Sequence, residues 1–178
     1  MAAENQMSID LTKADSLAVP HGFLGRTGGV SLGAMASLQC GLGADDDPGQ
    51  VRENRRRAAN AVLPGAALVS LRQVHGVRTV TVTDPIAQDA RKKGDALVTN
   101  QPDILLGILT ADCAPVLLAD AEAGVVGAAH AGWKGALDGV CASVVQAMTA
   151  LGADPARIAA AIGPCIARAS YEVDDAFF

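Results

Sequence analysis

Short apolar runs alternate along the chain with segments in which apolar residues recur every three or four positions. The short runs predict strands, and the run that contains TVTVT has the period of two that a half-buried strand shows. The predicted strands are Ala67–Gln73, Val77–Thr83, Asp95–Thr99, Ile104–Thr110, Pro115–Leu118, Gly124–Ala129 and Arg157–Ile162. Because helices are predicted between the strands, we expect an α/β or α+β fold with a mixed sheet.

Two longer segments have the spacing of amphipathic helices. The segment Leu137–Leu151 has apolar residues at intervals of three and four, and Gly152 is a suitable end for this helix. A second helix is predicted over 48–62, because Asp47 suits the cap position and a proline follows it. We interpret the basic run Arg55–Arg57 as the solvent-facing side of that second helix.

The composition indicates a single domain, residues 1–178, in which half of the residues are hydrophobic and can form a substantial core. The net charge is −5, which argues against non-specific nucleic-acid binding. No apolar run reaches the roughly 20 residues that a membrane helix needs. Residues 1–15 also lack the apolar core of a secretory signal. We therefore expect a cytoplasmic protein that binds neither nucleic acid nor membrane.

The four cysteines, at positions 40, 113, 141 and 165, include no CxxC pair. In a cytoplasmic protein we expect them to be reduced thiols. Cys141 falls within the apolar stripe of the helix predicted over Leu137–Leu151, and we expect it in the core. Cys165 is also expected to pack in the core, with a pocket-lining position as the alternative. Cys40 lies in a glycine-rich loop, and no role follows for it.

Two histidines and one cysteine are the clearest chemical signal in the chain. They are His75, Cys113 and His130, in the segments RQVHG, TADC and AHAGW. Each is expected in a loop after an apolar strand, where a sheet commonly presents functional side chains. Histidine and cysteine are zinc ligands, and three protein ligands leave the open position of a catalytic zinc site. The alternatives are a surface histidine at 75, a buried histidine at 130 and a small buried thiol at 113.

A set of motifs occurs in an order that resembles one known family. The motifs are HGFLGRTGG, LRQVHG, GDALVT, ILTADCAPVLL, AAHAGWKG and AIGPCI followed by SYEV, over about residues 20–173. Together they resemble the YfiH/YlmD family, whose members have been called polyphenol oxidase or laccase domain proteins. The resemblance implies a layered α/β sandwich with mixed sheets, related to the cytotoxic necrotizing factor deamidase fold.

The resemblance also implies a function. Family members are described as zinc-dependent purine nucleoside phosphorylases that act on adenosine, inosine, guanosine and methylthioadenosine, with adenosine deaminase activity. By this resemblance His75, Cys113 and His130 hold one catalytic Zn²⁺, and the partners are purine nucleosides and phosphate. A multicopper laccase is excluded by composition. A blue-copper centre takes two histidines and a cysteine, which leaves His21 alone for every other copper ion.

The chain departs from the family pattern at its end and at two positions. Members usually continue beyond SYEV, whereas this chain stops at Phe178, so we expect that it lacks the usual C-terminal part. Gln39 stands where an asparagine is common. Lys134 stands where many members have arginine, and the positive charge is kept.

Phosphorolysis requires groups that hold phosphate beside the ribose and a group that stabilises the leaving purine. Arg26, in the GRTGG loop, is the first candidate for phosphate, because a guanidinium and glycine amides suit an anion. Lys134 and Arg72 are further candidates, and Gln73 can hydrogen-bond a base or ribose. Asp112 is a candidate general acid or base, or a support that orients a ligand histidine.

Two other classes of function stay open from the residues alone. Cys113 can be the nucleophile of a hydrolase with His75 or His130 as its base. A non-catalytic regulatory module can also retain these residues. Trp133 is either a stacking partner for a purine or a core anchor, and His21 is expected to be structural or at the surface. The oligomeric state does not follow from the sequence.

Overall fold

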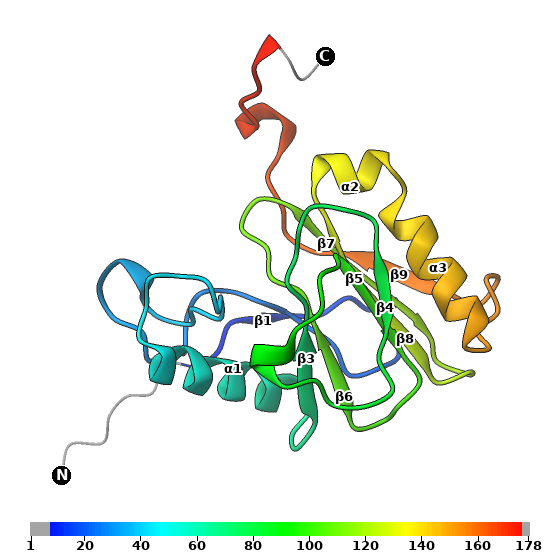
Figure 1. The fold of residues 1–178 in the computed structure, drawn as a ribbon, viewed down its shortest axis with the longest axis horizontal. Helices are drawn as coiled ribbons and strands as arrows, with labels where there is room; N and C mark the ends of the chain where they lie inside the picture. Colours follow the sequence, from blue (N-terminus) through cyan, green and yellow to red (C-terminus); the bar gives the residue numbers. More distant parts are fainter. Residues whose placement is uncertain (1–7, 176–178) are drawn as a thin grey trace.

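In the computed structural model, which describes residues 8–175, a five-stranded mixed sheet forms the centre of the fold (Figure 1). Neighbouring strands are β4 and β5 in parallel, and then β8, β7 and β9, each antiparallel to the one before. Their bounds are Thr79–Thr81 (β4), Ala96–Thr99 (β5), Val125–Ala131 (β8), Ala114–Asp120 (β7) and Ala159–Ile162 (β9). The structure confirms the predicted α/β class with mixed sheets.

Two smaller sheets lie beside the main one. β3 (Ala67–Ser70) pairs in parallel with β6 (Ile104–Gly107), and α1 (Pro48–Val62) packs against β3. β1 (Leu11–Thr12) is antiparallel to β2 (Phe23–Leu24). Short 3-10 turns occur at Gly33–Met35, Gln88–Ala90 and Arg168–Ser170. In Figure 1, α1 and α3 lie at opposite sides of the molecule.

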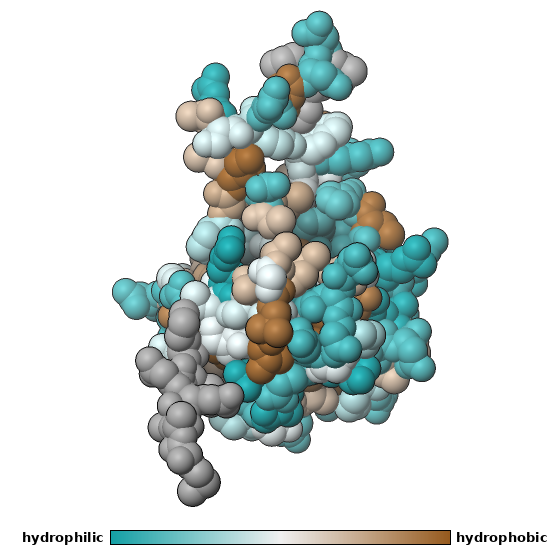
Figure 2. Space-filling view, turned by 90° about the vertical axis from the view of Figure 1, so that its left-hand side faces the viewer, coloured by the Kyte–Doolittle hydropathy of each residue, from teal (hydrophilic) through white to brown (hydrophobic). Residues whose placement is uncertain are grey.

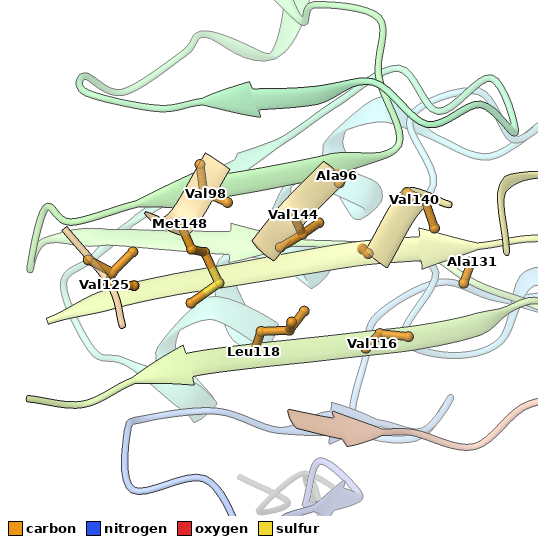
Figure 3. Close-up of a cluster of buried hydrophobic side chains, with 11 residues drawn as sticks. Ala96, Val98, Val116, Leu118, Val125, Ala131, Val140, Val144 and Met148 are labelled. Carbon is orange, nitrogen blue, oxygen red and sulfur yellow. The ribbon is translucent and has the colours of Figure 1, made fainter. Parts of the chain in front are cut away.

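Helix α3 (Val140–Ala150) covers one face of the main sheet and forms an apolar core with it (Figure 3). Val140, Val144 and Met148 recur on one side of the helix, and all three are fully buried. The helix can come close because β8 has a glycine at position 127, where a Cβ would lie only 2.7 Å from Cγ1 of Val144. Cys141 is partly buried and packs against this core.

The segment predicted as one helix from Leu137 is two helices. α2 (Trp133–Leu137) and α3 are separated by a turn at Gly139, whose φ of 94° lies in the left-handed region that favours glycine. The turn leaves Leu137 outside the apolar face, and its side chain is 79 % exposed. The prediction that Leu137 belongs to the apolar face of this helix is wrong. The three positions from Leu137 to Val140 span a turn and not a continuous helix.

Helix α1 begins as predicted, with the Asp47 side chain accepting a hydrogen bond from a backbone N–H of the first turn. The solvent-facing interpretation of the basic run is wrong for Arg55, which is only 3 % exposed. Its Nη1 donates to the carbonyl oxygen of Cys40, and its Nη2 donates to Oγ of Ser70. Arg55 thus ties the glycine-rich loop and β3 to the helix, whereas the two arginines after it form ion pairs nearer the surface.

The chain after β9 leaves the sheet. In Figure 1, residues 163–175 extend away from the sheet, and Cys165 is exposed there. The prediction that Cys165 packs in the core is therefore wrong. Predictions that concern residues 1–7 and Phe178 lie outside the described residues.

The surface seen in Figure 2 is mostly hydrophilic, with hydrophobic side chains in separate patches. Exposed large apolar residues in the described chain include Leu32, Leu137 and Ile162. Among the described helices, none is long and apolar enough to cross a membrane.

We expect Met148→Ala to lower the free energy of unfolding by about 2–5 kcal/mol, because it removes a fully buried side chain beneath α3. Leu137→Ala is the matched control. Its side chain is exposed, so the free energy of unfolding should change by no more than about 0.5 kcal/mol. Urea unfolding followed by circular dichroism measures both. Equal losses would contradict the exposed position of Leu137.

A second prediction concerns pH. Asp120, at the end of β7, is fully buried, and hydrogen bonds from Arg157 lower its pKa to about 2 from an ordinary 3.8. The folded state therefore favours the charged carboxylate, and this stabilisation is lost as pH falls through the folded-state pKa. We expect the melting temperature to drop between about pH 4 and about pH 2. Asp120→Asn should be less stable at neutral pH and show a flatter dependence over that interval.

Candidate metal centre

His75 lies in a tight turn between β3 and β4. Its φ of 58° makes it the one non-glycine residue with positive φ among residues 8–175. The turn is held by a single carboxylate, that of Asp95, which accepts hydrogen bonds from three successive backbone N–H groups. The donors are Val74 at 3.1 Å, His75 at 2.8 Å and Gly76 at 2.8 Å. These hydrogen bonds offset the free-energy cost of the left-handed backbone conformation that His75 adopts.

The same carboxylate binds the second histidine. Oδ1 of Asp95 lies 2.9 Å from Nδ1 of His130, and the backbone N–H of His130 donates to the carbonyl oxygen of Asp95 at 2.7 Å. Asp95 is fully buried, and His130 is only 4 % exposed. A carboxylate accepts hydrogen bonds, so Nδ1 of His130 carries the proton and Nε2 keeps the lone pair for a metal.

Hydrogen bonding decides the charge of Asp95. Burial by itself raises its pKa, but the bonds from His130 and from the three backbone N–H groups outweigh burial and hold the pKa below its ordinary value. The carboxyl group is therefore an anion at neutral pH.

Cys113 precedes β7, and the pairing of β7 with β8 brings it beside Gly132. Ala114 pairs with Ala131, so the next residue outward on each strand meets the other. A Cβ on Gly132 would lie 2.9 Å from Cδ2 of His75 and 3.3 Å from Sγ of Cys113. The absence of a side chain at Gly132 therefore lets the ring of His75 and the thiol of Cys113 lie close to each other.

One donor atom from each of His75, Cys113 and His130 lies within 4.8 Å of the others. The two imidazole rings meet edge to face, with centroids 4.7 Å apart. Zinc bonds of about 2.0–2.1 Å to nitrogen and about 2.3 Å to sulfur place the donors around one ion roughly 3.5 Å apart. The observed spacing, within 4.8 Å, is close to that value, and side-chain rotation is the adjustment that binding would require. The donor set therefore fits a divalent ion such as zinc.

The trio differs in exposure: His75 is exposed, Cys113 is intermediate and His130 is buried. A metal held by these side chains is reached from the His75 side. In Figure 1 the loop before β4, the loop before β7 and the start of α2 lie at the same end of the molecule. Cys113 lies in the loop after β6, as predicted, and directly before β7. His130 does not follow a strand as predicted, because it lies inside β8.

Burial raises the pKa of the Cys113 thiol, and the negative charges of Asp112 and Asp95 raise it further. These surroundings disfavour the free thiolate, whereas a bound metal ion displaces the thiol proton. Because donor atoms of His75 and His130 lie within 4.8 Å of the thiol, a cysteine–histidine pair is the alternative use of the same residues.

The structure gives Gln73 a role in positioning the loop before β7. Its Nε2 donates to the carbonyl oxygen of Leu109 at 2.7 Å, and its Oε1 accepts from the backbone N–H of the same residue at 2.9 Å. These bonds join the segment before His75 to the segment that leads to Cys113. Asp112 is exposed beside Cys113, and its carbonyl oxygen accepts from the backbone N–H of Ile166.

The other predicted residues lie in several places. Arg26, Arg72 and Lys134 are all exposed. Trp133 is half exposed at the first residue of α2, so its interpretation as a core anchor is wrong. Both ring nitrogens of His21 are hydrogen-bonded, Nε2 to the backbone N–H of Ala14 and Nδ1 to the carbonyl oxygen of Val19. The structural prediction for His21 is confirmed.

Asp95 is the residue of the site that the sequence pattern does not predict, because the pattern indicates only the start of a strand at this position. The available signal was the GDALVT motif, which places an acidic residue directly before a wholly apolar run. An ionisable residue next to a buried strand requires partners.

A sequence profile of the family described as "Multi-copper polyphenol oxidoreductase laccase" matches residues 20–178. YlmD from Geobacillus stearothermophilus has the same fold, with a TM-score of 0.83 and 36 % identity over 92 % of this chain and 64 % of that one. YfiH from Bacillus licheniformis has a TM-score of 0.80 and 36 % identity over 87 % of this chain and 61 % of that one. The chain belongs to the YfiH/YlmD family.

Relatives of this YfiH/YlmD-family chain have names that describe an activity. The "Purine nucleoside phosphorylase" of Deinococcus radiodurans is 50 % identical over 169 residues, which are 94 % of this chain and 64 % of that protein. The "Purine nucleoside phosphorylase ORF3" of Streptomyces griseus is 47 % identical over 155 residues, 86 % of this chain and 63 % of that protein. The family member described here thus spans less than two thirds of the length of these relatives.

We expect Gly132→Ala to weaken zinc binding by this YfiH/YlmD-family chain, because the added methyl group pushes the ring of His75 and the thiol of Cys113 apart. The loss should reach roughly 10- to 100-fold, as for other changes that misplace metal ligands. Gly43→Ala is the matched control, since nothing lies within 4 Å of a Cβ at that exposed glycine. Competition with a zinc-sensitive dye measures both affinities. Unchanged affinity in Gly132→Ala would contradict the close approach of the three ligands.

Proposed function

We propose that His75, Cys113 and His130 bind one zinc ion and that the chain is the zinc-bearing part of a purine nucleoside phosphorylase. The main support is the convergence of two imidazoles and one thiol to within 4.8 Å at one end of the sheet. This site occurs in a chain that is 50 % identical to a protein named purine nucleoside phosphorylase. Three protein ligands leave one position of a tetrahedral ion for water or substrate.

Zinc suits this site better than the copper that the family's description mentions. Within residues 8–175 the structure has one group of three or more metal-ligand side chains, whereas a multicopper oxidase needs several copper sites. A blue-copper site also takes a weak axial ligand, usually methionine. The two described methionines are engaged elsewhere: Met148 lies in the core, and Met35 contacts the amide of Gln39.

When bound, zinc supplies a Lewis acid that polarises an oxygen or activates water at neutral pH. The chain's own residues position the reactants. Asp95 holds the ring of His130, and Gln73 holds the loop that carries Cys113. We propose a second role for Gln73, in which the remaining amide hydrogen contacts the base or the ribose. Asp112, exposed next to Cys113, is the proposed general acid or base for the purine or for water.

Phosphate requires cations near the trio, and we propose exposed arginine and lysine side chains for this role. Arg72 and Lys93 form an isolated parallel bridge, with both side chains exposed. Among the described residues neither forms an ion pair. Like charges directly opposite each other are unfavourable, and an anion between them removes the repulsion. Their proximity in sequence to His75 and Asp95 supports a phosphate position there, together with the proposed contacts from Arg26 and Lys134.

The proposed reactions share this centre. In phosphorolysis a phosphate oxygen forms a bond to C1′ of the ribose, the bond from C1′ to the purine nitrogen breaks, and the purine takes up a proton. The proposed substrates are adenosine, inosine, guanosine and methylthioadenosine. In deamination, water replaces the 6-amino group of adenosine and ammonia leaves, as in zinc-dependent base deaminases. We propose the cytoplasm as the location of both reactions.

The test is turnover by the purified, zinc-loaded chain. Inosine with phosphate should yield hypoxanthine and ribose 1-phosphate, and adenosine without phosphate should yield inosine and ammonia. Both are measured by chromatography. Cys113→Ala should lower kcat/KM by more than the roughly 10- to 100-fold that changes around a metal ligand cost. Cys141→Ala, at a thiol that packs against the core and belongs to no proposed site, is the matched control and should keep the activity.

The alternatives give different outcomes. Equal turnover by zinc-stripped protein would overturn the zinc proposal and favour Cys113 as a nucleophile. Zinc binding without turnover of any of the four nucleosides would favour a regulatory module.

A further inference from the structure

We propose that Asp95 is the positioning residue of the metal centre and acts on both histidine ligands at once. Its carboxylate holds the left-handed turn that presents His75, and it holds His130 in the tautomer that presents Nε2 to the metal. The inference rests on the proposed function for its relevance to catalysis, but it can be tested on the metal-free chain.

The first action is on the turn. Two carboxylate oxygens accept from all three successive N–H groups of residues 74–76. These N–H groups converge on one point because His75 has positive φ. Without the anion, three backbone donors are left unsatisfied, and a side chain at positive φ loses the contacts that keep it there. His75 is exposed, so solvent rather than a closed packing shell surrounds part of the residue.

The second action is on the ring of His130. Oδ1 lies 2.9 Å from Nδ1 in a site that is almost closed to water. A neutral imidazole carries one proton, and an acceptor at Nδ1 places that proton there. Nε2 is then the only ring nitrogen with a lone pair. If Nδ1 lost its acceptor, the proton could move to Nε2, and His130 would no longer be a ligand.

Every hydrogen bond of the Asp95 side chain in the described residues goes to one of these two segments. Asp120, which is also a fully buried carboxylate with a lowered pKa, has partners of a different kind. Asp120 accepts from the backbone N–H groups of Ala123 and Asp154 and from the guanidinium of Arg157, all remote from the trio along the sheet. Asp120 is a structural anion with a cation beside it. The hydrogen-bonding partners of Asp95 are backbone N–H groups and the ligand His130.

Asp95→Asn keeps the size and shape of the side chain. It therefore changes the hydrogen bonds at residue 95 and leaves the packing around it nearly unchanged. Oδ2 of Asp95 faces only the turn, whereas Oδ1 faces both the turn and Nδ1 of His130. An amide nitrogen at the Oδ2 position removes acceptors from the turn. At the Oδ1 position it removes acceptors from the turn and also meets Nδ1 of His130, which must then accept, so that Nε2 holds the proton. Either orientation weakens the turn of His75, and the second also weakens His130 as a ligand.

The experiment compares wild type, Asp95→Asn and Asp120→Asn. Zinc affinity is measured by competition with a chelator, without substrate. The tautomer of His130 is read from imidazole ¹⁵N shifts of the metal-free protein at about pH 8, where a free imidazole is neutral. We expect wild type to show Nδ1–H at His130, and we expect Asp95→Asn to bind zinc roughly 10- to 100-fold more weakly. Its ¹⁵N spectrum should show either the Nε2–H tautomer at His130 or a displaced His75.

Asp120→Asn is the matched control. It also removes a buried carboxylate and should lower the melting temperature, but zinc affinity and the His130 tautomer should match wild type. Unchanged zinc affinity in Asp95→Asn would overturn the proposal, as would an equal loss in Asp120→Asn. If wild type binds no zinc, the proposed function fails. The tautomer comparison still decides the role of Asp95, because an Nε2–H tautomer in wild type would refute it.

Discussion

A buried carboxylate requires hydrogen-bond donors in its surroundings, and this constraint on Asp95 links the elements at one end of the sheet. Burial disfavours its charge, whereas four N–H donors favour it, and the donors prevail. The donors are available only because the chain makes a left-handed turn at His75 and because β8 places His130 beside β5. Strand pairing, turn conformation and ring orientation therefore depend on one another.

Close backbone approach makes this arrangement possible. Gly132 lies under the ring of His75 and the thiol of Cys113, and Gly135 lies against the carbonyl oxygen of Gly76, where a Cβ would be 2.8 Å away. α2 can therefore rest directly on the turn. Larger residues at these two positions would move the helix outward and open the site. The AHAGWKG segment thus serves packing as much as chemistry: His130 is a proposed ligand, and the two glycines make room for His75 and Cys113.

The fold was predictable where burial leaves a simple pattern. β5 and most of β7 and β8 are buried, so their mainly apolar composition identifies them as strands. The pattern failed where one residue changes the direction of the chain. Gly139 breaks the helical interval and exposes Leu137. It also failed for Arg55, because a long side chain can reach polar partners across an interface that a helical wheel does not describe.

The sequence by itself determined the ligand types, their order along the chain, the mixed α/β class and the scarcity of histidine that excludes a multicopper enzyme. The tertiary structure decided that His75, Cys113 and His130 meet, that Asp95 supports two of them, and that Gln73 bridges loops. The physical reason is that a hydrogen bond between residues 35 positions apart, such as that of Asp95 with His130, depends on strand register. Register is set by the packing of the whole sheet, and no local pattern of residues records which distant side chains it will bring together.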